Sequence, residues 1–168
     1  LLARFPGGYR GMHATVHRFV EKQGGFARKE DHKQIGLWYQ KDKDVCDPLY
    51  SDEEAVYHLV SAKEADLAAP TAENVADHYR KTLRYADAGQ VLKAVIDLSP
   101  TPANLCPLLV SRGNLYDDLG KYARAADDFQ AIIETTKNRK ESTELKSSGY
   151  HGLANALSSL GRYEEAVQ

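Results

Sequence analysis

Two stretches of this sequence repeat one pattern 41 residues apart, and this repetition restricts the fold more than any other feature. The first stretch runs from Gly113 to Phe129 and the second from Ala154 to Ala166. In each, a small residue and large apolar residues lead to Leu-Gly, a basic residue and Tyr, with Ala three residues after the tyrosine. Recurrence at such a spacing predicts stacked helical hairpins, because one hairpin is too small to bury its apolar face alone.

The composition is that of a folded protein without a strong electrostatic preference for a partner. Of the 168 residues, 42% are hydrophobic and 27% are charged, and the formal net charge is −2 at pH 7. This balance gives no general attraction to nucleic acid or to acidic membranes. Lys93 and Asp97 interrupt the longest apolar runs, so the sequence predicts no membrane span.

The cysteines and the ends of the sequence bear on its context. Cys46 and Cys106 form neither a C-x-x-C motif nor a disulfide framework, which favours an intracellular, cytoplasmic protein. No acidic residue precedes Glu21, so organelle import stays open as an alternative. The sequence starts without Met and stops at Gln168, about seven residues into a helical pattern that is too short to be stable alone. We therefore expect a piece of a longer protein.

The first fifty residues differ from the rest. Six of the twelve glycines fall within the first 36 positions, and glycine weakens the interiors of helices and strands. Residues 1–50 are therefore predicted to be an irregular, glycine-rich segment with one short helix over 13–22. Aromatic residues such as Trp38 and Tyr39 are expected to hold this segment against the body of the protein.

Residues 51–168 are predicted to be a helical repeat domain, since no segment alternates with the period of two that marks a strand. Ser51 and Glu54 form a capping box that would start the first helix. Pro70 would end that helix, and Thr71 would cap the next one. The helices are expected at about 51–69, 72–83, 86–98, 103–119, 121–136, 145–160 and from 162 onward.

Three segments of this domain resemble the tetratricopeptide repeat family, whose unit is a helix–turn–helix of about 34 residues. In the clearest copy, at about 106–139, the family's signature positions are occupied by Leu109, Gly113, Tyr116, Gly120, Tyr122, Ala125 and Phe129. A truncated copy spans about 146–168, and a more degenerate copy spans about 67–101 with Leu83 in place of the turn glycine. Arg112 stands where the family usually has Leu, and seven extra residues at 138–144 lengthen the last connection.

The resemblance implies an all-α fold, an α-solenoid of antiparallel helix–turn–helix repeats. In this family the first helix of each hairpin lines a concave groove that holds a partner protein as a peptide or a helix. Carried over by position, the partner-binding residues are Asp77, Arg80, Lys81, Asn114, Asp117, Asp118, His151 and Asn155. The same face also carries Glu73, Asn74, Val110, Ser111, Ser158 and Ser159. The resemblance does not favour nucleic acid or a small-molecule substrate as partner.

One binding mode of the family is disfavoured by the residues present. Some members grip the acidic C-termini of chaperones with Lys or Arg and Asn at fixed groove positions. Asn114 and Asn155 match the asparagine, but Val110 and His151 occupy the basic position. A carboxylate bound there would lack its counter-charge.

No catalytic, cofactor-binding or metal site is predicted. His13 and His17 lie one helical turn apart, but Ala14 stands where a zinc protease needs its glutamate, so both histidines are interpreted as solvated. Basic and aromatic residues at 28–43 could stack on RNA, yet interspersed acidic residues weaken that interpretation. The pairs at 117–118 and 127–128 are interpreted as charges on exposed helix faces.

The sequence therefore favours a non-catalytic scaffold, a repeat module that holds partner proteins within a larger multiprotein assembly. The alternative is the repeat region of a larger enzyme, such as a glycosyltransferase or a hydroxylase, whose catalytic domain lies outside this chain.

Overall fold

Helices dominate the computed structural model, which describes residues 4–5, 8–9, 29–41, 47–137 and 143–166. They are α2 (Lys29–Lys41), α3 (Pro48–Ser61), α4 (Ala65–Lys81), α5 (Tyr85–Ile96), α6 (Pro102–Asp118), α7 (Tyr122–Thr136), α8 (Thr143–Ser159) and α9 (Tyr163–Ala166). Two short strands, β1 (Arg4–Phe5) and β2 (Gly8–Tyr9), pair antiparallel near the N-terminus. The predicted all-α repeat fold is confirmed, and this small ladder is an addition that the sequence pattern did not indicate.

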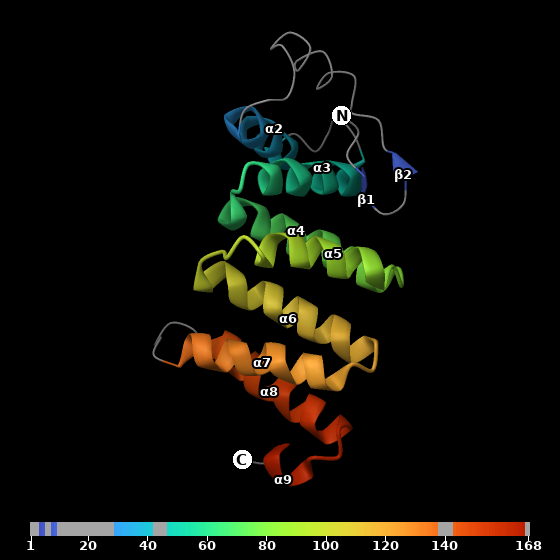
Figure 1. The fold of residues 1–168 in the computed structure, drawn as a ribbon, viewed down its shortest axis with the longest axis vertical. Helices are drawn as coiled ribbons and strands as arrows, with labels where there is room; N and C mark the ends of the chain where they lie inside the picture. Colours follow the sequence, from blue (N-terminus) through green and yellow to red (C-terminus); the bar gives the residue numbers. More distant parts are fainter. Residues whose placement is uncertain (1–3, 6–7, 10–28, 42–46, 138–142, 167–168) are drawn as a thin grey trace.

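The helices follow one another down an elongated column, with α2 near one end and α9 at the other (Figure 1). Each helix packs on its neighbours in the sequence. In addition, α4 packs on α6 and α6 packs on α8, so the first helices of successive hairpins lie side by side. This arrangement, in which each hairpin contacts mainly the next, is that of a solenoid. Among the described helices, none is long and apolar enough to cross a bilayer.

The core is divided into clusters along the column. One cluster joins α3, α4, α5 and α6 around residues such as Leu59, Val75 and Leu92. A second joins α6, α7 and α8 around Ala125 and Phe129. Helix α6 contributes to both clusters, since its residues face neighbours on either side. Ala125 is fully buried, as expected for a small residue where two helices approach closely.

The turns between hairpin helices share one backbone conformation. The residue that follows the C-cap is left-handed at Lys63, Leu83, Gly120 and Gly161, with φ between 58° and 75°. In each turn the next amide donates to a carbonyl five residues back, as from Arg84 to Tyr79 at 2.7 Å. This Schellman arrangement satisfies carbonyls that a helix end leaves without partners. The turn at Leu83 therefore matches the turn at Gly120, although it lacks the glycine.

Pro70 does not end a helix, contrary to the prediction, and Thr71 is not a cap. Both lie within α4, where Pro70 is the sixth residue. A proline there leaves the carbonyl of Asp66 without its helical donor. The side-chain amide of Asn104, at the start of α6, donates to that carbonyl at 3.4 Å. The Asp66 carboxylate also accepts hydrogen bonds from Thr101 and Asn104, so the polar contacts at this proline join two repeats.

The start of α3 also differs from the prediction. Pro48 is its first residue, and the Asp47 carboxylate accepts a hydrogen bond from the amide of Tyr50 at 3.1 Å. Ser51 and Glu54, predicted as a capping box, lie inside the helix and are buried. An Asp-Pro pair is an equally good start signal, since proline suits the first helical position.

The prediction that residues 1–50 are irregular is wrong for part of that segment. Residues 29–41 form α2, and Pro48–Tyr50 belong to α3. Tyr39 is fully buried against α3, which agrees with its expected role in holding the segment to the body. Gly36 allows this packing, because a Cβ there would lie 2.7 Å from Cγ of Leu59. The predicted helix at 13–22, His13 and His17, Cys46 and the extra residues up to 142 lie outside the described residues.

Candidate partner-binding groove

The eight residues predicted to bind a partner gather on one face of the column. Asp77, Arg80 and Lys81 come from α4, Asn114, Asp117 and Asp118 from α6, and His151 and Asn155 from α8. The face contains two adjoining hollows, of about 250 Å³ between α4 and α6 and about 270 Å³ between α6 and α8. Val110 and Asn114 line both hollows. The hollows therefore form one continuous groove, which we call the α4–α6–α8 groove.

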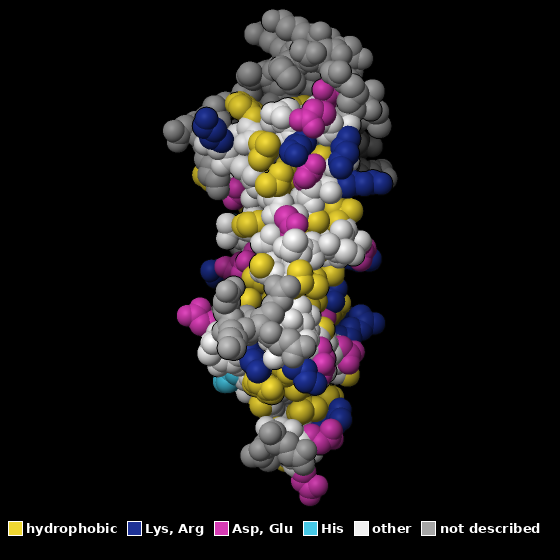
Figure 2. Space-filling view, turned by 90° about the vertical axis from the view of Figure 1, so that its left-hand side faces the viewer, with side chains coloured by type: hydrophobic (Ala, Val, Ile, Leu, Met, Phe, Trp, Pro, Cys, Tyr) yellow, Lys and Arg dark blue, Asp and Glu magenta, His cyan; other side chains and the backbone are white. Residues whose placement is uncertain are grey.

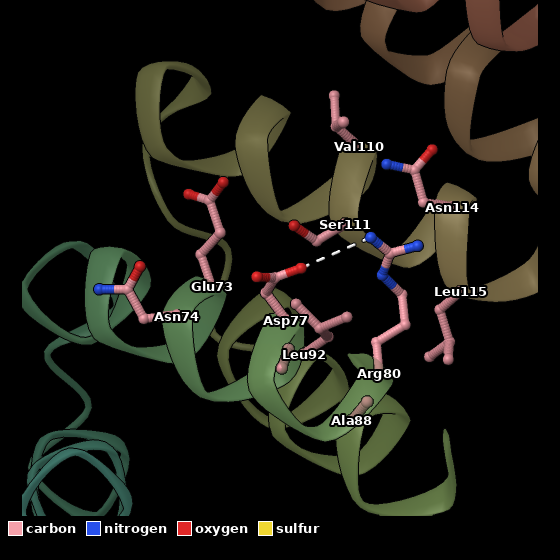
Figure 3. A pocket seen from close by; sticks show the side chains of 11 residues that line it. Glu73, Asn74, Asp77, Arg80, Ala88, Leu92, Val110, Ser111, Asn114 and Leu115 are labelled. Atoms are coloured by element: carbon pink, nitrogen blue, oxygen red, sulfur yellow. Dashed lines mark hydrogen bonds and ion pairs between the residues drawn. The ribbon is translucent and has the colours of Figure 1, made fainter. Parts of the chain in front are cut away.

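The hollow between α4 and α6 is lined by charged, amide and hydroxyl side chains together with apolar residues such as Leu92 and Leu115 (Figure 3). Arg80 reaches across it, and its guanidinium lies 3.0 Å from a carboxylate oxygen of Asp118 on α6. Arg80 also lies 3.5 Å from Asp77, and Lys81 lies 2.6 Å from the same carboxylate. The hydrogen bond from Lys81 is the main cause that lowers the pKa of Asp77 below its usual value. Lys81 and Asp118 thus stand at the rim, paired with residues that line the hollow.

Glu73 faces the same hollow from the preceding turn of α4 (Figure 3). Burial, and to a lesser degree the negative charge of Asp77, raises the pKa of Glu73. Among the described residues no cation pairs with its carboxylate, whereas Asp77 and Asp118 have theirs. Sequence position placed Glu73 on this face but gave no sign of its burial or of its missing counter-charge.

The hollow between α6 and α8 has a more apolar floor. Phe129 of α7 lines it together with Val110, and Asn114, Asp117, His151 and Asn155 surround it. Phe129 is only 3% exposed, because glycine at position 152 lets α8 pack directly on the ring, where a Cβ would lie 2.4 Å from Cε1. The side-chain amide of Asn155 lies 3.1 Å from Nε2 of His151, one turn earlier. Sequence reasoning missed Phe129 as a groove residue, since it assigned that ring to the packing of the hairpin alone.

Two of the three helices that line the groove, α6 and α8, lie largely within residues that match a known sequence family. The family model for the tetratricopeptide repeat matches residues 107–139 and 147–168. Residues 107–168 are a tetratricopeptide-repeat segment. No curated protein matches this chain. The matched segments begin one residue after the predicted copies at 106–139 and 146–168, so the predicted resemblance is confirmed for this part of the chain.

The tetratricopeptide repeat explains why particular residues sit where they do. Gly113 lies against Phe129, and a Cβ at position 113 would be 2.8 Å from Cζ of the ring. Gly120 and Gly161 provide the left-handed turns of the two matched hairpins. The upstream copy predicted at about 67–101 lies outside the matched residues, but α4 and α5 there form a hairpin with the same turn. Tetratricopeptide repeats generally mediate protein–protein interaction, so the groove has the setting of a partner-binding surface.

One departure from the repeat pattern is compensated inside the hairpin. Arg112 replaces the usual leucine and forms a two-point ion pair with Asp128 on α7, with N–O distances of 2.8 and 2.6 Å. Asp128 is only 5% exposed, so the interpretation of the pair at 127–128 as surface charges is wrong for Asp128. This hydrogen bonding raises the pKa of Arg112 above its usual value. The signal was present in the sequence, because a cation at an apolar position calls for an anion on the facing helix.

A second polar cluster lies between α2 and α3, outside the groove. His58 is buried, its Nδ1 lies 2.9 Å from Nδ1 of His32, and its Nε2 lies 3.8 Å from a Glu54 oxygen. Burial, together with the nearby His32, lowers the pKa of His58 to about 3. The described residues include no group of three or more side chains suited to hold a metal ion. We interpret this cluster as part of the packing between α2 and α3.

The structure disfavours the RNA-stacking alternative, because residues on which it depends are engaged within the protein. Tyr39 is fully buried and cannot stack on a base. The ammonium of Lys33 lies 3.3 Å from a carboxylate oxygen of Glu64, so its charge is directed to the protein itself. Acidic and basic side chains are also interspersed along the face of the column seen in Figure 2. These features do not form the continuous basic surface that a nucleic acid would need.

Proposed function

We propose that this chain is a non-catalytic interaction module that holds partner proteins within a larger assembly. In this proposal the partner lies along the α4–α6–α8 groove. The main support is geometric, because residues predicted from three separate hairpins line two adjoining hollows on a single face. The groove overlaps a tetratricopeptide-repeat segment, a type of repeat that generally binds proteins. We place the assembly inside the cell, in the cytoplasm, on the basis of the cysteine content of the chain.

The test is site-specific photo-crosslinking in the organism that makes the protein. A photoreactive amino acid at Ser111, which lines the groove, is compared with the same amino acid at Gln130, which is exposed on α7. We expect a discrete protein adduct from position 111 and no such adduct from position 130. An adduct that forms only from position 130 would contradict the groove as the binding surface.

A pair of triple variants then tests whether groove side chains bind the crosslinked partner. Asn114→Ala, Asp117→Ala and Asn155→Ala together remove three polar groups from the groove. The matched control changes Gln90, Asp127 and Gln130 to Ala at exposed positions of α5 and α7. Alanine favours helix in both sets, so both variants should keep their helical content. Loss of the adduct in the groove variant alone is expected; equal adducts in both variants would contradict the proposal.

A further inference from the structure

The two hollows of the groove differ in chemistry, and this difference restricts what can bind there. The groove face carries four carboxylates, of Glu73, Asp77, Asp117 and Asp118, against two cations, Arg80 and Lys81. Both cations are held by carboxylates of the groove itself. No ion pair joins Glu73 or Asp117 to a cation of the described residues. The groove therefore has an excess of two negative charges at neutral pH, which favours a basic partner.

Glu73 is the carboxylate best placed to select a cation. It lines the hollow between α4 and α6 and is partly buried, whereas Asp117 is exposed. An ion pair formed in a partly buried hollow is less screened than one on an open surface. The raised pKa of Glu73 agrees with a carboxylate that lacks a counter-charge. Arg80 does not oppose a second cation strongly, because Asp77 and Asp118 flank its guanidinium.

The neighbouring hollow suits an apolar side chain. Its apolar lining is Val110 together with Phe129, of which 3% stays exposed beside Gly152. An apolar group in this hollow would cover the hydrocarbon that Val110 and Phe129 still expose, which is favourable in proportion to the area covered. At about 270 Å³, the hollow is smaller than pockets for drug-sized ligands, which start at about 300 Å³. It is therefore suited to a single side chain.

The distance between the hollows sets the spacing of the two side chains. Neighbouring packed helices lie about 8–10 Å apart, and the hollows are one first-helix spacing apart along α4, α6 and α8. A polyproline-II segment rises about 3.1 Å per residue with three residues per turn, so residues three apart point the same way at roughly 9 Å. Such a segment also exposes its own amides and carbonyls, which the Asn114 side chain between the hollows can satisfy.

We propose that the groove selects an extended segment that carries Lys or Arg opposite Glu73 and an apolar side chain in the hollow between α6 and α8, three residues apart. This inference rests on the proposed function, since it specifies the partner of the same groove. The segment is read in either chain direction. The pattern recognised in the segment is a basic residue, two positions of any type and an apolar residue.

The probe is a displayed library of random 12-residue peptides, selected on the 168-residue chain. We expect enriched peptides to share a basic and an apolar residue at this spacing. In a synthetic enriched peptide, replacing Lys by the uncharged norleucine should weaken binding about tenfold at low salt, as for loss of one partly buried ion pair. The same replacement should have no effect on Glu73→Gln, while the control Glu134→Gln on α7 should behave as the unmodified chain does.

The outcomes separate the two proposals. Enriched peptides that bind Glu73→Gln as well as the unmodified chain, or that lack the basic residue, would overturn the specificity proposed here. If those peptides still lose binding in the Asn114, Asp117 and Asn155 variant, the groove function itself stands. Peptides that bind both triple variants equally, or no enrichment at all, would overturn both proposals. Melting curves by circular dichroism confirm that each variant is folded before its binding is compared.

Discussion

The ring of Phe129 lies between two helices that can approach it only because each carries glycine at the contact. A Cβ at Gly113 of α6 would lie 2.8 Å from the ring, and a Cβ at Gly152 of α8 would lie 2.4 Å from it. Both glycines lie against Cε1 and Cζ of the ring. A single side chain thus contacts two successive repeats and lines the groove between them.

Gly152→Ala should therefore destabilise the protein, although alanine is the better helix former. Overpacking of this kind costs about 1–3 kcal/mol, which exceeds the gain of about 0.5–1 kcal/mol in helix propensity. Gly89→Ala in α5 is the matched control, because its Cβ would meet only Leu115 at 3.6 Å. Urea denaturation should show a lower midpoint for Gly152→Ala and an equal or higher one for Gly89→Ala. A higher midpoint for both would mean that the ring can relax.

His58 makes stability depend on pH in a predictable direction. Its pKa is lowered to about 3 in the folded protein from a usual value of 6.5, first by burial and then by His32. Between these values the unfolded chain binds a proton at His58 and the folded chain does not. Stability is therefore fully present above pH 6.5 and is lost as the pH falls, by about 1.4 kcal/mol per pH unit.

The window from pH 6.5 to 5 lies above the range in which most carboxylates titrate. Burial also lowers the pKa of His32, which therefore adds to the loss of stability in the same direction. We expect the free energy of unfolding to fall by about 2 kcal/mol across the window. His58→Gln should flatten the pH dependence, whereas His151→Gln, at an exposed position, should leave it unchanged. Urea denaturation at pH 7.5, 6.5, 5.8 and 5.0 measures the slope. An unchanged slope in His58→Gln would show that other groups cause it.

Secondary-structure elements show which parts of the fold could be predicted from sequence. From α5 to α8 the predicted and observed ends differ by no more than two residues, because turns and apolar periodicity agree there. The error at Pro70 arose because the side-chain amide of Asn104, in the next repeat, donates to the Asp66 carbonyl that proline leaves without its helical donor. The helix α2 was missed because Gly36 suggests a loop, although its role is close packing on Leu59.

The sequence predicts which residues lie on the groove face, but not how they are buried or paired there. The eight predicted residues share one face because repeat register alone fixes which side of a first helix points inward. Register does not reveal which of them are paired, so the ion pair from Arg80 to Asp118 was not foreseen. Nor does it reveal that a second-helix residue, Phe129, lines the groove where Gly152 packs on its ring. Whether these residues bind a partner stays a prediction.

The hairpin turns allow the cost of a left-handed backbone to be compared at Leu83 and Gly120. Leu83 is left-handed with φ of 60° and is 72% exposed, so its side chain contributes little packing to offset the backbone strain. Leu83→Gly should raise the free energy of unfolding by roughly 0.5–1 kcal/mol, after allowing for the greater freedom of glycine in the unfolded chain. Thermal melts of the purified chain measure this change.

The reciprocal change at the equivalent turn serves as the control. Gly120 has φ of 66°, and a Cβ there meets nothing within 4 Å. Gly120→Ala therefore changes backbone strain without creating a clash, and it should lower the free energy of unfolding by about 1 kcal/mol. If Leu83→Gly were also destabilising, the side chain of Leu83 would have to make stabilising contacts that its exposure does not indicate.

At the scale of the whole molecule, the column is held by clusters that meet at α6. Leu108 and Leu115 of α6 belong to the cluster with α3, α4 and α5, whereas Cys106 and Leu109 belong to the cluster with α7 and α8. In a solenoid each repeat is stabilised mainly by its neighbours, so a local defect should spread only as far as the next interface. The chain should therefore open in parts rather than as one unit.

Phe129→Ala tests this expectation by removing the centre of the second cluster. The substitution of a buried phenylalanine costs about 3–5 kcal/mol, and that loss should fall on α7 and α8. Hydrogen exchange followed by mass spectrometry should show faster exchange in these helices and little change in α4 and α5. Leu59→Ala, in the first cluster, should reverse the pattern by accelerating α3 and α4 while α7 and α8 stay protected. Uniform acceleration of exchange in both variants would instead mean that α6 transmits each defect along the entire column. Both halves would then unfold together, and the groove could not open at one hollow alone.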